Sequence, residues 1–536
     1  MNISSIDICI IGIYMIAMII LGIKLGKKNE SQEDYFLAGR NMPFFPVGLS
    51  IIATMVSAAS FIGAPGGSYN SGLSYFMINA NIPLVLFIAS GVFIPFMYNL
   101  KVTSCYEYLG QRFGTRIRII CSIAFIVNSV MLIGIMIYGP AMILNRLTGW
   151  DISVIIPVLI LIVIIYTLTG GISAVIWTDA IQMIVLWVGI AACIILAIND
   201  SGLSFWESLT VAQEAGKLNA LNFSPDITVQ DTVWVSIFGI GIFHLQYFTC
   251  DQSQVQRMFT SRSVKNMKKS FLLSGIVINI QFALFMIIGL VLFASYGGRE
   301  FSDANSVMIE FISTKIPQGI FGLILAALLA ATMSSIDSLL NSMSTVFVKD
   351  IYEPYRRNKD KNKDFNANLS ISRWITFVFA IFIFIFTYFG LSASTSPLVT
   401  MMGEYCSYIT GSILGVFILA MFTNKANEKG TILGFISGIL ITILVAKATA
   451  INWGWYNLIG ISITILVGYV ISILSGGNKK DISGQTFMSM RENMIKLGKI
   501  KEDGMYIIPG KFDKSSYILV GIFIIQFLIL GILQYM

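Results

Sequence analysis

Long apolar segments recur along the whole chain, and each is about as long as a membrane is thick. A helix of about 18 or more mostly apolar residues crosses the roughly 30 Å hydrocarbon core of a bilayer. Polar and charged residues gather in the stretches between these segments. The pattern predicts an all-α integral membrane protein with about 14 transmembrane helices. We expect these helices at residues 6–26, 46–68, 75–98, 119–144, 153–169, 174–198, 233–249, 271–296, 320–347, 374–391, 397–421, 431–446, 456–474 and 516–535.

The positions of the basic residues provide a test of this pattern. Cytoplasmic loops of membrane proteins are enriched in Lys and Arg. All but five of the 35 basic residues fall in alternate loops, starting with the loop after the first helix. The asymmetry predicts that both termini lie outside the plasma membrane, which we expect to be a bacterial inner membrane. It also explains the net charge of +7 without nucleic-acid binding. The exceptions are Arg146, Lys217, Arg299, Lys315 and Lys447.

Composition excludes several classes of protein. The chain is 56% hydrophobic and only 12% charged, so a water-soluble globular protein is excluded. The six cysteines form no CxxC pair and there is one histidine, which argues against disulfide frameworks and zinc sites. Phosphate-binding loops, nucleophile elbows and zinc-protease motifs are absent from the sequence, so we expect neither an enzyme nor an ATP-driven pump. Nothing implies an obligate protein partner.

The order of the predicted helices suggests an internal repeat. Helices two to six and seven to eleven form two groups of five, and an odd-numbered repeat must be inverted in the membrane. We expect a first helix and loop at 1–44, a first repeat at 45–198 and an extracellular loop at 199–232. The second repeat covers 233–421, and three further helices cover 422–536. Residues 475–515 are rich in Lys, Asp and Gly, which predicts a cytoplasmic linker without a core.

The first helix of each repeat contains residues that weaken a helix. The second helix holds the run Gly63-Ala-Pro-Gly-Gly67, and the seventh holds Gly239 and Gly241 before Asp251. Interrupted helices in corresponding positions indicate a binding site near the middle of the membrane, where freed carbonyl groups can contact ions and solute. Close packing through small residues is the alternative explanation.

Carboxylates and hydroxyls inside the predicted spans are candidate ion ligands. A charged side chain in hydrocarbon costs about 3 kcal/mol or more, so its presence there indicates a function. Such oxygen atoms suit a hard cation such as sodium, although the hydroxyls alone could simply bond to their own helix. The only histidine, His244, is either a packed hydrogen-bonding residue or a solute contact. The candidate ligands are Asp179, Asp337 and one helical face with Ala331, Ser334, Ser335 and Ser338.

Six short stretches together resemble the sodium:solute symporter family over nearly the full length of the chain. The resemblance implies the five-plus-five inverted-repeat fold of the leucine-transporter class, with one helix before the core and three after it. It also implies symport of a small solute with sodium ions, one or two per cycle. The stretches are Glu33–Arg40, Ala53–Ala58, Thr103–Leu109, Gly170–Asp179, Asp251–Arg257 and Ser334–Asn341.

The same resemblance implies which residues form the sites. A first sodium site uses the carbonyls of Ala53, Val56 and Ala331 with the hydroxyls of Ser334 and Ser335. A second sodium site, found in part of the family, uses Asp179, Ser334 and Ser338, with Asp337 where some relatives have serine. The solute pocket draws on Ser57, Ser60, Asn79, His244 and Tyr247, with Tyr247 or Phe248 as an inner gate.

The resemblance leaves the solute open among sugars, sialic acids and small carboxylates. Galactose symporters have Glu at the position of Asn79 and Lys near Ile278 or Asn279. Sialic-acid symporters have Arg at the position of Leu132, so the arginine that pairs with a carboxylate is missing here. Proton-coupled symport and a solute-sensing membrane receptor remain the alternative functions.

Overall fold

The computed structural model describes residues 4–26, 31–359, 369–390 and 398–535. Helices make up nearly all of the described chain, with one small two-stranded sheet, β1 (Lys501–Glu502) and β2 (Met505–Tyr506). The boundary between the predicted helices 374–391 and 397–421 falls at residues outside this description. Short 3-10 or π-helical turns join several of the helices, among them η4 (Val235–Ile240).

The α-helices follow one another in this order: α1 (Ser5–Gly26), α2 (Gln32–Leu37), α3 (Phe44–Met55), α4 (Ala58–Ser71), α5 (Met77–Ala80), α6 (Ile82–Ile88), α7 (Ile94–Leu100), α8 (Cys105–Arg112), α9 (Thr115–Thr148), α10 (Ile152–Ser201), α11 (Phe205–Glu214), α12 (Gly241–Cys250), α13 (Gln252–Phe259), α14 (Val264–Ser295), α15 (Ala304–Thr314), α16 (Ile320–Val346), α17 (Glu353–Lys359), α18 (Leu369–Ile385), α19 (Leu398–Phe422), α20 (Glu428–Ala448), α21 (Tyr456–Leu474), α22 (Phe487–Lys496) and α23 (Tyr517–Tyr535).

Many of these helices are long and apolar enough to cross a membrane. Within the described residues, 11 helical segments meet that description by length and composition. Three shorter apolar helices lie where further spans were expected, at Phe44–Met55, Ile152–Ile165 and Val235–Cys250. The prediction of an all-α, multi-span protein is therefore confirmed.

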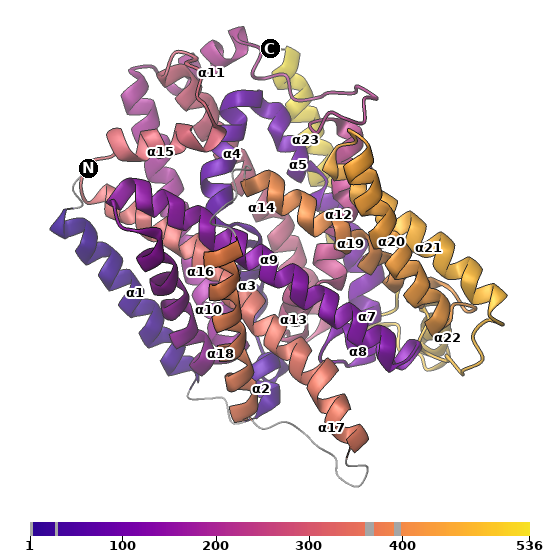
Figure 1. Ribbon diagram of the computed structural model, residues 1–536. Coiled ribbons are helices and arrows are strands. Elements are labelled where there is room, and N and C mark those ends of the chain that lie inside the picture. The colour runs from indigo at the N-terminus through magenta and orange to yellow at the C-terminus, as the bar shows by residue number, and fades with distance from the viewer. Residues whose placement is uncertain (1–3, 27–30, 360–368, 391–397, 536) are drawn as a thin grey trace.

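Helix α16 lies at the centre of the molecule. It contacts α1, α3, α9, α10 and α18, and almost every side chain from Phe321 to Val346 is buried (Figure 1). A helix that is buried all round needs no polar face towards water or lipid. Its serines and its aspartate, Asp337, therefore face other helices of the protein.

The two ends of the chain are tied to the same side of the molecule. The Asp7 carboxylate of α1 accepts hydrogen bonds from the backbone amides of Gly319 (2.8 Å) and Gly322 (2.7 Å), at the start of α16. Near the other terminus, Gln534 of α23 accepts from the amide of Leu221, which follows α11 (3.0 Å). In Figure 1 α1 begins and α23 ends on the side that carries α11 and α15.

The predicted break in the second span is displaced. Helix α4 continues through the run from Gly63 to Gly67, whereas the chain leaves the helical conformation earlier, at Val56 and Ser57. The glycines instead allow close packing. A Cβ atom on Gly66 would lie 2.0 Å from the carbonyl oxygen of Ala304 in α15. Placing the break at the glycines was therefore wrong, and close packing explains them.

Residues 475–515 are folded, so the expectation of a linker without a core is wrong. This segment contains α22 and the small sheet, and it buries Met490, Met494 and Ile508. The Phe512 ring stacks on Phe87 of α6 with 4.3 Å between centroids. Nearby, a buried ion pair joins Lys268 of α14 to Asp513 at 2.6 Å, and Lys268 also donates to the Tyr506 carbonyl. The segment therefore packs against the ends of the helices.

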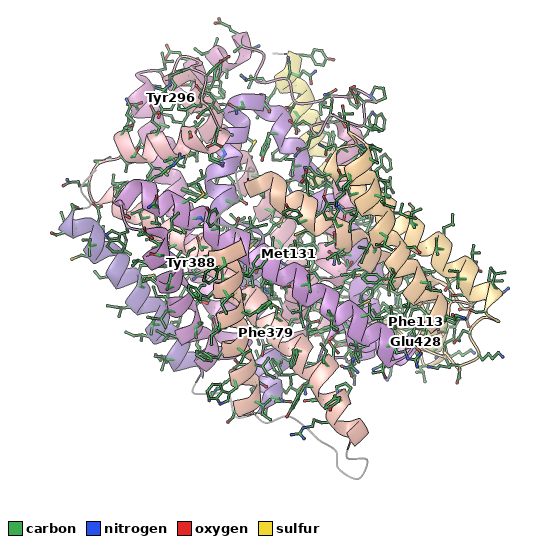
Figure 2. The ribbon with its side chains drawn as sticks, viewed as in Figure 1. Phe113, Met131, Tyr296, Phe379, Tyr388 and Glu428 are labelled. Atoms are coloured by element: carbon green, nitrogen blue, oxygen red, sulfur yellow. The ribbon has the colours of Figure 1, made fainter. Side chains whose placement is uncertain are left out.

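The helices near the C-terminus are also attached to the first half of the chain. Glu428, at the start of α20, accepts a hydrogen bond from the backbone amide of Arg116 in α9 (3.0 Å). Figure 2 shows Glu428 beside Phe113, in the turn between α8 and α9. Helices α19, α20 and α21 pack on one another, and Gly434 of α20 approaches the backbone of α21 too closely for a larger side chain.

Candidate functional site

The break between α3 and α4 exposes backbone carbonyl groups inside the protein. Val56 and Ser57 are extended, and the Ser57 hydroxyl caps α4 by accepting from the amide of Ser60. An interrupted helix leaves the carbonyls of its last turn without helical donors. The carbonyls of Ala53 and Thr54 belong to that last turn.

Two serines of α16 meet these carbonyls. The Ser334 hydroxyl donates to the Ala53 carbonyl (2.9 Å), and the Ser335 hydroxyl donates to the Thr54 carbonyl (3.3 Å). Both hydroxyls also lie within hydrogen-bond distance of the Ala331 carbonyl, at 3.2 Å and 3.3 Å. Four of the five residues expected at the first sodium site are thus brought together, and Val56 lies in the break itself. The sequence analysis did not include Thr54, whose carbonyl oxygen also faces this group.

The second group of expected ligands is also clustered, but around an arginine. The Asp179 carboxylate of α10 lies 3.0 Å from the guanidinium Nη2 of Arg257 in α13, and both side chains are fully buried. Ser50 of α3 donates to Asp179 at 2.5 Å and accepts from Arg257 Nε at 2.7 Å. Arg257 also donates to the hydroxyl of Ser338. Asp337 joins this group by accepting from the Ser338 hydroxyl at 3.2 Å.

The ion pair changes the electrostatics expected for that second site. A carboxylate that is already neutralised by a guanidinium attracts a further cation much less. The other oxygen of Asp179, Oδ1, is buried and has no hydrogen-bond partner among the described residues. Arg257 lies in one of the stretches that suggested the family, yet its distance of 78 residues from Asp179 along the chain hid the pairing.

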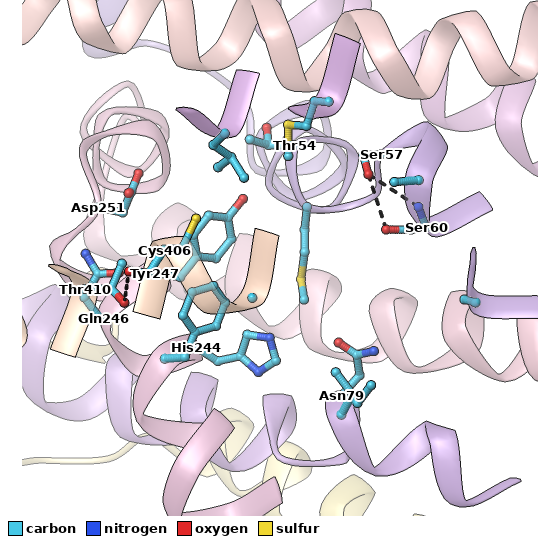
Figure 3. Close-up of a pocket in the computed structure, with 18 of the residues that line it drawn as sticks. Thr54, Ser57, Ser60, Asn79, His244, Gln246, Tyr247, Asp251, Cys406 and Thr410 are labelled. Atoms are coloured by element: carbon cyan, nitrogen blue, oxygen red, sulfur yellow. Dashed lines mark hydrogen bonds between the residues drawn. The ribbon is translucent and has the colours of Figure 1, made fainter. Parts of the chain in front are cut away.

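A cavity of about 190 Å³ lies beside the α3–α4 break. Thr54 lines it together with the expected residues Ser57, Ser60, Asn79, His244 and Tyr247 (Figure 3). Phe248, the sixth expected residue, is instead buried behind Tyr247, with 5.2 Å between the ring centroids. The sequence analysis missed several polar residues of the lining, namely Asn128, Gln246, Asp251 and Thr410.

The surface of this cavity is mostly apolar, with several hydrogen-bonding side chains set in it, and it is nearly uncharged. Among the described residues that line it, Asp251 is the one charged side chain, and its carboxylate caps α13 by accepting from the amide and hydroxyl of Ser253, at 2.9 Å and 2.5 Å. Leu132 of α9 lines the cavity where an arginine was noted for sialic-acid symporters. The described lining thus offers hydrogen bonds and apolar contact.

Within the described residues, no three or more His, Cys, Asp and Glu side chains gather as they would at a transition-metal site. The arrangement that does occur, hydroxyls facing free carbonyls, suits a hard monovalent cation.

The chain matches a known family and several known transporters. Residues 35–438 match the sodium:solute symporter family. The sodium/sialic acid symporter NanT of Aliivibrio fischeri is 29% identical over 472 residues, which cover 87% of this chain and 92% of the relative. The sodium-dependent multivitamin transporter of Oryctolagus cuniculus is 30% identical, over 82% of this chain and 70% of the relative.

Solved structures agree with these matches. The substrate-bound, outward-open state of a sodium-coupled sialic acid symporter superposes with a TM-score of 0.80 at 27% identity, covering 89% of this chain and all of that one. Mhp1, a nucleobase-cation-symport-1 transporter, has a TM-score of 0.51 at 12% identity, covering 92% of this chain and 99% of its own, and so shares the fold alone. Each of these proteins is a transporter.

Proposed function

This chain belongs to the sodium:solute symporter family, and from that premise we propose that it couples sodium entry to the uptake of a small polar organic solute by alternating access. Membership of this family favours sodium over protons as the coupling ion. Each ion moving inward across 100 mV releases about 2.3 kcal/mol. A tenfold sodium gradient adds about 1.4 kcal/mol, so one ion can sustain a solute gradient of about a hundredfold or more.

One arrangement carries the proposal: the hydroxyls of Ser334 and Ser335 face the carbonyls freed by the α3–α4 break. Sodium prefers carbonyl and hydroxyl oxygens as ligands. We assign the first site to the carbonyls of Ala53, Val56 and Ala331 with these two hydroxyls. Entry of the ion turns the hydroxyl oxygens towards it and replaces their hydrogen bonds. Because Thr54 lines the neighbouring cavity, the ion then stabilises the wall of the solute pocket.

A second sodium ion has an additional requirement. Its ligands would be Asp179, Ser334, Asp337 and Ser338, and Arg257 must first release Asp179. We therefore propose one sodium ion at the first site in this conformation, and a second only after Arg257 moves.

The solute pocket follows from the cavity lining. We assign solute contacts to Ser57, Ser60, Asn79, His244 and Tyr247, with Tyr247 as the inner gate. The names of the relatives include symporters of sialic acid, vitamins and monocarboxylates, which are polar organic solutes, and also of iodide, an inorganic anion. The cavity, of about 190 Å³, offers a polar organic solute apolar surface together with several hydrogen-bonding side chains.

We further propose fourteen crossings of a bacterial inner membrane with both termini outside. This number counts the three shorter apolar helices as parts of spans. The interrupted pair α3–α4 and the η4–α12 segment would be the first helices of two inverted repeats, at 45–198 and 233–421.

Substituting Ser335 tests the sodium site. In Ser335→Ala we expect sodium to stabilise the purified protein only at about tenfold higher concentration, because an oxygen ligand is lost. The measurement is the melting temperature in sodium compared with potassium chloride, followed by sodium-driven uptake in proteoliposomes. Ser344→Ala is the matched control, since this serine of the same helix donates to Ser372 instead. An unchanged sodium response in Ser335→Ala would remove the assignment.

A further inference from the structure

The only histidine of the chain faces the cavity with one ring nitrogen already committed. His244 is buried, with 3% of its surface exposed, and it lines the cavity from α12. Its Nδ1 lies 2.7 Å from the side-chain oxygen of Asn81. Figure 3 shows the imidazole in the pocket between Tyr247 and Asn79. The other ring nitrogen, Nε2, is the one left for a solute.

The orientation of the Asn81 amide decides which hydrogen His244 carries. The Asn81 amide nitrogen donates to the backbone carbonyl of Ile78 at 3.1 Å, so its oxygen is the atom that faces the ring. An amide oxygen only accepts hydrogen bonds. Nδ1 must therefore donate, and in the neutral ring Nε2 is left as an acceptor.

The position of Asn81 is itself fixed by the surrounding backbone. Asn81 is 1% exposed, and it joins α5 to α6. The Ser236 hydroxyl of η4 donates to the Met77 carbonyl of α5, which ties this segment to the helix that carries His244. Gln526 of α23 donates to the carbonyl of Ala80, the residue before Asn81. These contacts hold the amide against the ring from behind the pocket wall.

We propose that Asn81 is a positioning residue that determines solute specificity by fixing His244 in the Nδ1–H tautomer. The solute must then present a hydrogen-bond donor, a hydroxyl or an amide N–H, to His244 Nε2. A solute with only acceptors at that point would leave two acceptors facing each other, which costs the desolvation of both. The inference rests on the proposed function for the existence of a solute, but the state of the ring can be measured without one.

The tautomer can be observed directly, because the single histidine provides the only pair of imidazole nitrogen signals. With ¹⁵N-histidine incorporated into the full chain in lipid nanodiscs, we expect Nδ1 to carry the hydrogen and Nε2 to be unprotonated at neutral pH. In Asn81→Leu we expect that pure state to be lost and a mixture of tautomers to appear. Asn279→Leu is the matched control, since among the described residues the Asn279 side chain bonds only to the Gly275 carbonyl of its own helix. A wild-type ring protonated at Nε2 would overturn the proposal.

Specificity provides the second measurement. In sodium, we expect N-acetylneuraminate or lactate, which carry hydroxyl donors, to raise the melting temperature, and pyruvate and iodide to leave it unchanged. Asn81→Leu should weaken binding of the donor-bearing probe by about tenfold or more while the shift due to sodium alone is kept. Equal stabilisation by lactate and pyruvate, or stabilisation by iodide, would exclude the donor requirement. Loss of the sodium shift in the wild type would instead count against the proposed symport.

Discussion

Asp179 and Arg257 form a charge pair in a place where neither charge is stable alone. Both side chains are fully buried, and Ser50 bonds to both of them. Removing one partner of a buried pair typically costs about 3–5 kcal/mol, because the other charge is left uncompensated. Replacing both partners by neutral groups costs much less. The pair therefore holds α10 and α13 together only while both charges are present.

This asymmetry gives a prediction for single and double substitutions. We expect Arg257→Gln to lower the free energy of unfolding by about 3–5 kcal/mol, and Asp179→Asn with Arg257→Gln to lower it by clearly less. The measurement is thermal unfolding of the purified variants in potassium chloride. We also expect sodium to restore part of the stability of Arg257→Gln, since Asp179 then lacks its counter-charge. Additive effects of the two substitutions would show that the charges do not interact.

The sequence predicted which kinds of side chain gather at the site, but not all of the contacts between them. Ser334 and Ser335 were identifiable because hydroxyls at helical spacing in an apolar segment need a reason, and Asp179 because a carboxylate there is costly. Arg257 and Asn81 were not, because each acts on a residue far away along the chain, and side-chain pairing across helices leaves no periodic signal. Phe248 was misplaced because it immediately follows a lining residue on a helix and so points elsewhere.

Helix α4 shows how glycines in a membrane helix can serve packing rather than flexibility. Gly66 lets α15 approach, and Gly67 lies against the ring of Tyr75. A Cβ atom on Gly289 of α14 would lie 2.3 Å from the carbonyl oxygen of Pro65. In lipid, where association of helices gains little from the hydrophobic effect, small residues at the interface provide the close contact. The helix therefore remains continuous where its composition suggested a break.

Filling the space at Gly66 should disturb this contact. In Gly66→Ala the new Cβ would lie 2.0 Å from a backbone oxygen of α15, which cannot rotate away. We expect the free energy of unfolding to fall by about 1–3 kcal/mol, as at other overpacked sites. The measurement is the melting temperature, which should be lower. Gly12→Ala in α1 is the control, because no atom lies within 4 Å of the added methyl group. Equal melting temperatures for the two variants would mean that α15 can move away from the new methyl group without loss of stability.

At the scale of the whole molecule, the hydrophobic pattern predicted the all-α membrane fold because lipid leaves the backbone few alternatives. The same reasoning failed for residues 475–515, where composition alone decides little. Met494 and Ile508 of this segment are buried, and Phe512 stacks on Phe87, which is far away along the chain. Only the assembled helix ends supply the surface that makes this segment fold.

The charges of the chain predict its orientation in the membrane, and this orientation can be measured. Because the basic residues gather on the side opposite to the termini, the positive-inside rule predicts that α23 ends outside. We expect alkaline phosphatase fused after Met536 to be active in bacteria and green fluorescent protein at the same position to be dark. Adding one further membrane-spanning helix before each reporter should reverse both signals. A fluorescent fusion to the unmodified chain would place the termini in the cytoplasm, and would require the basic loops to face outward against the charge rule.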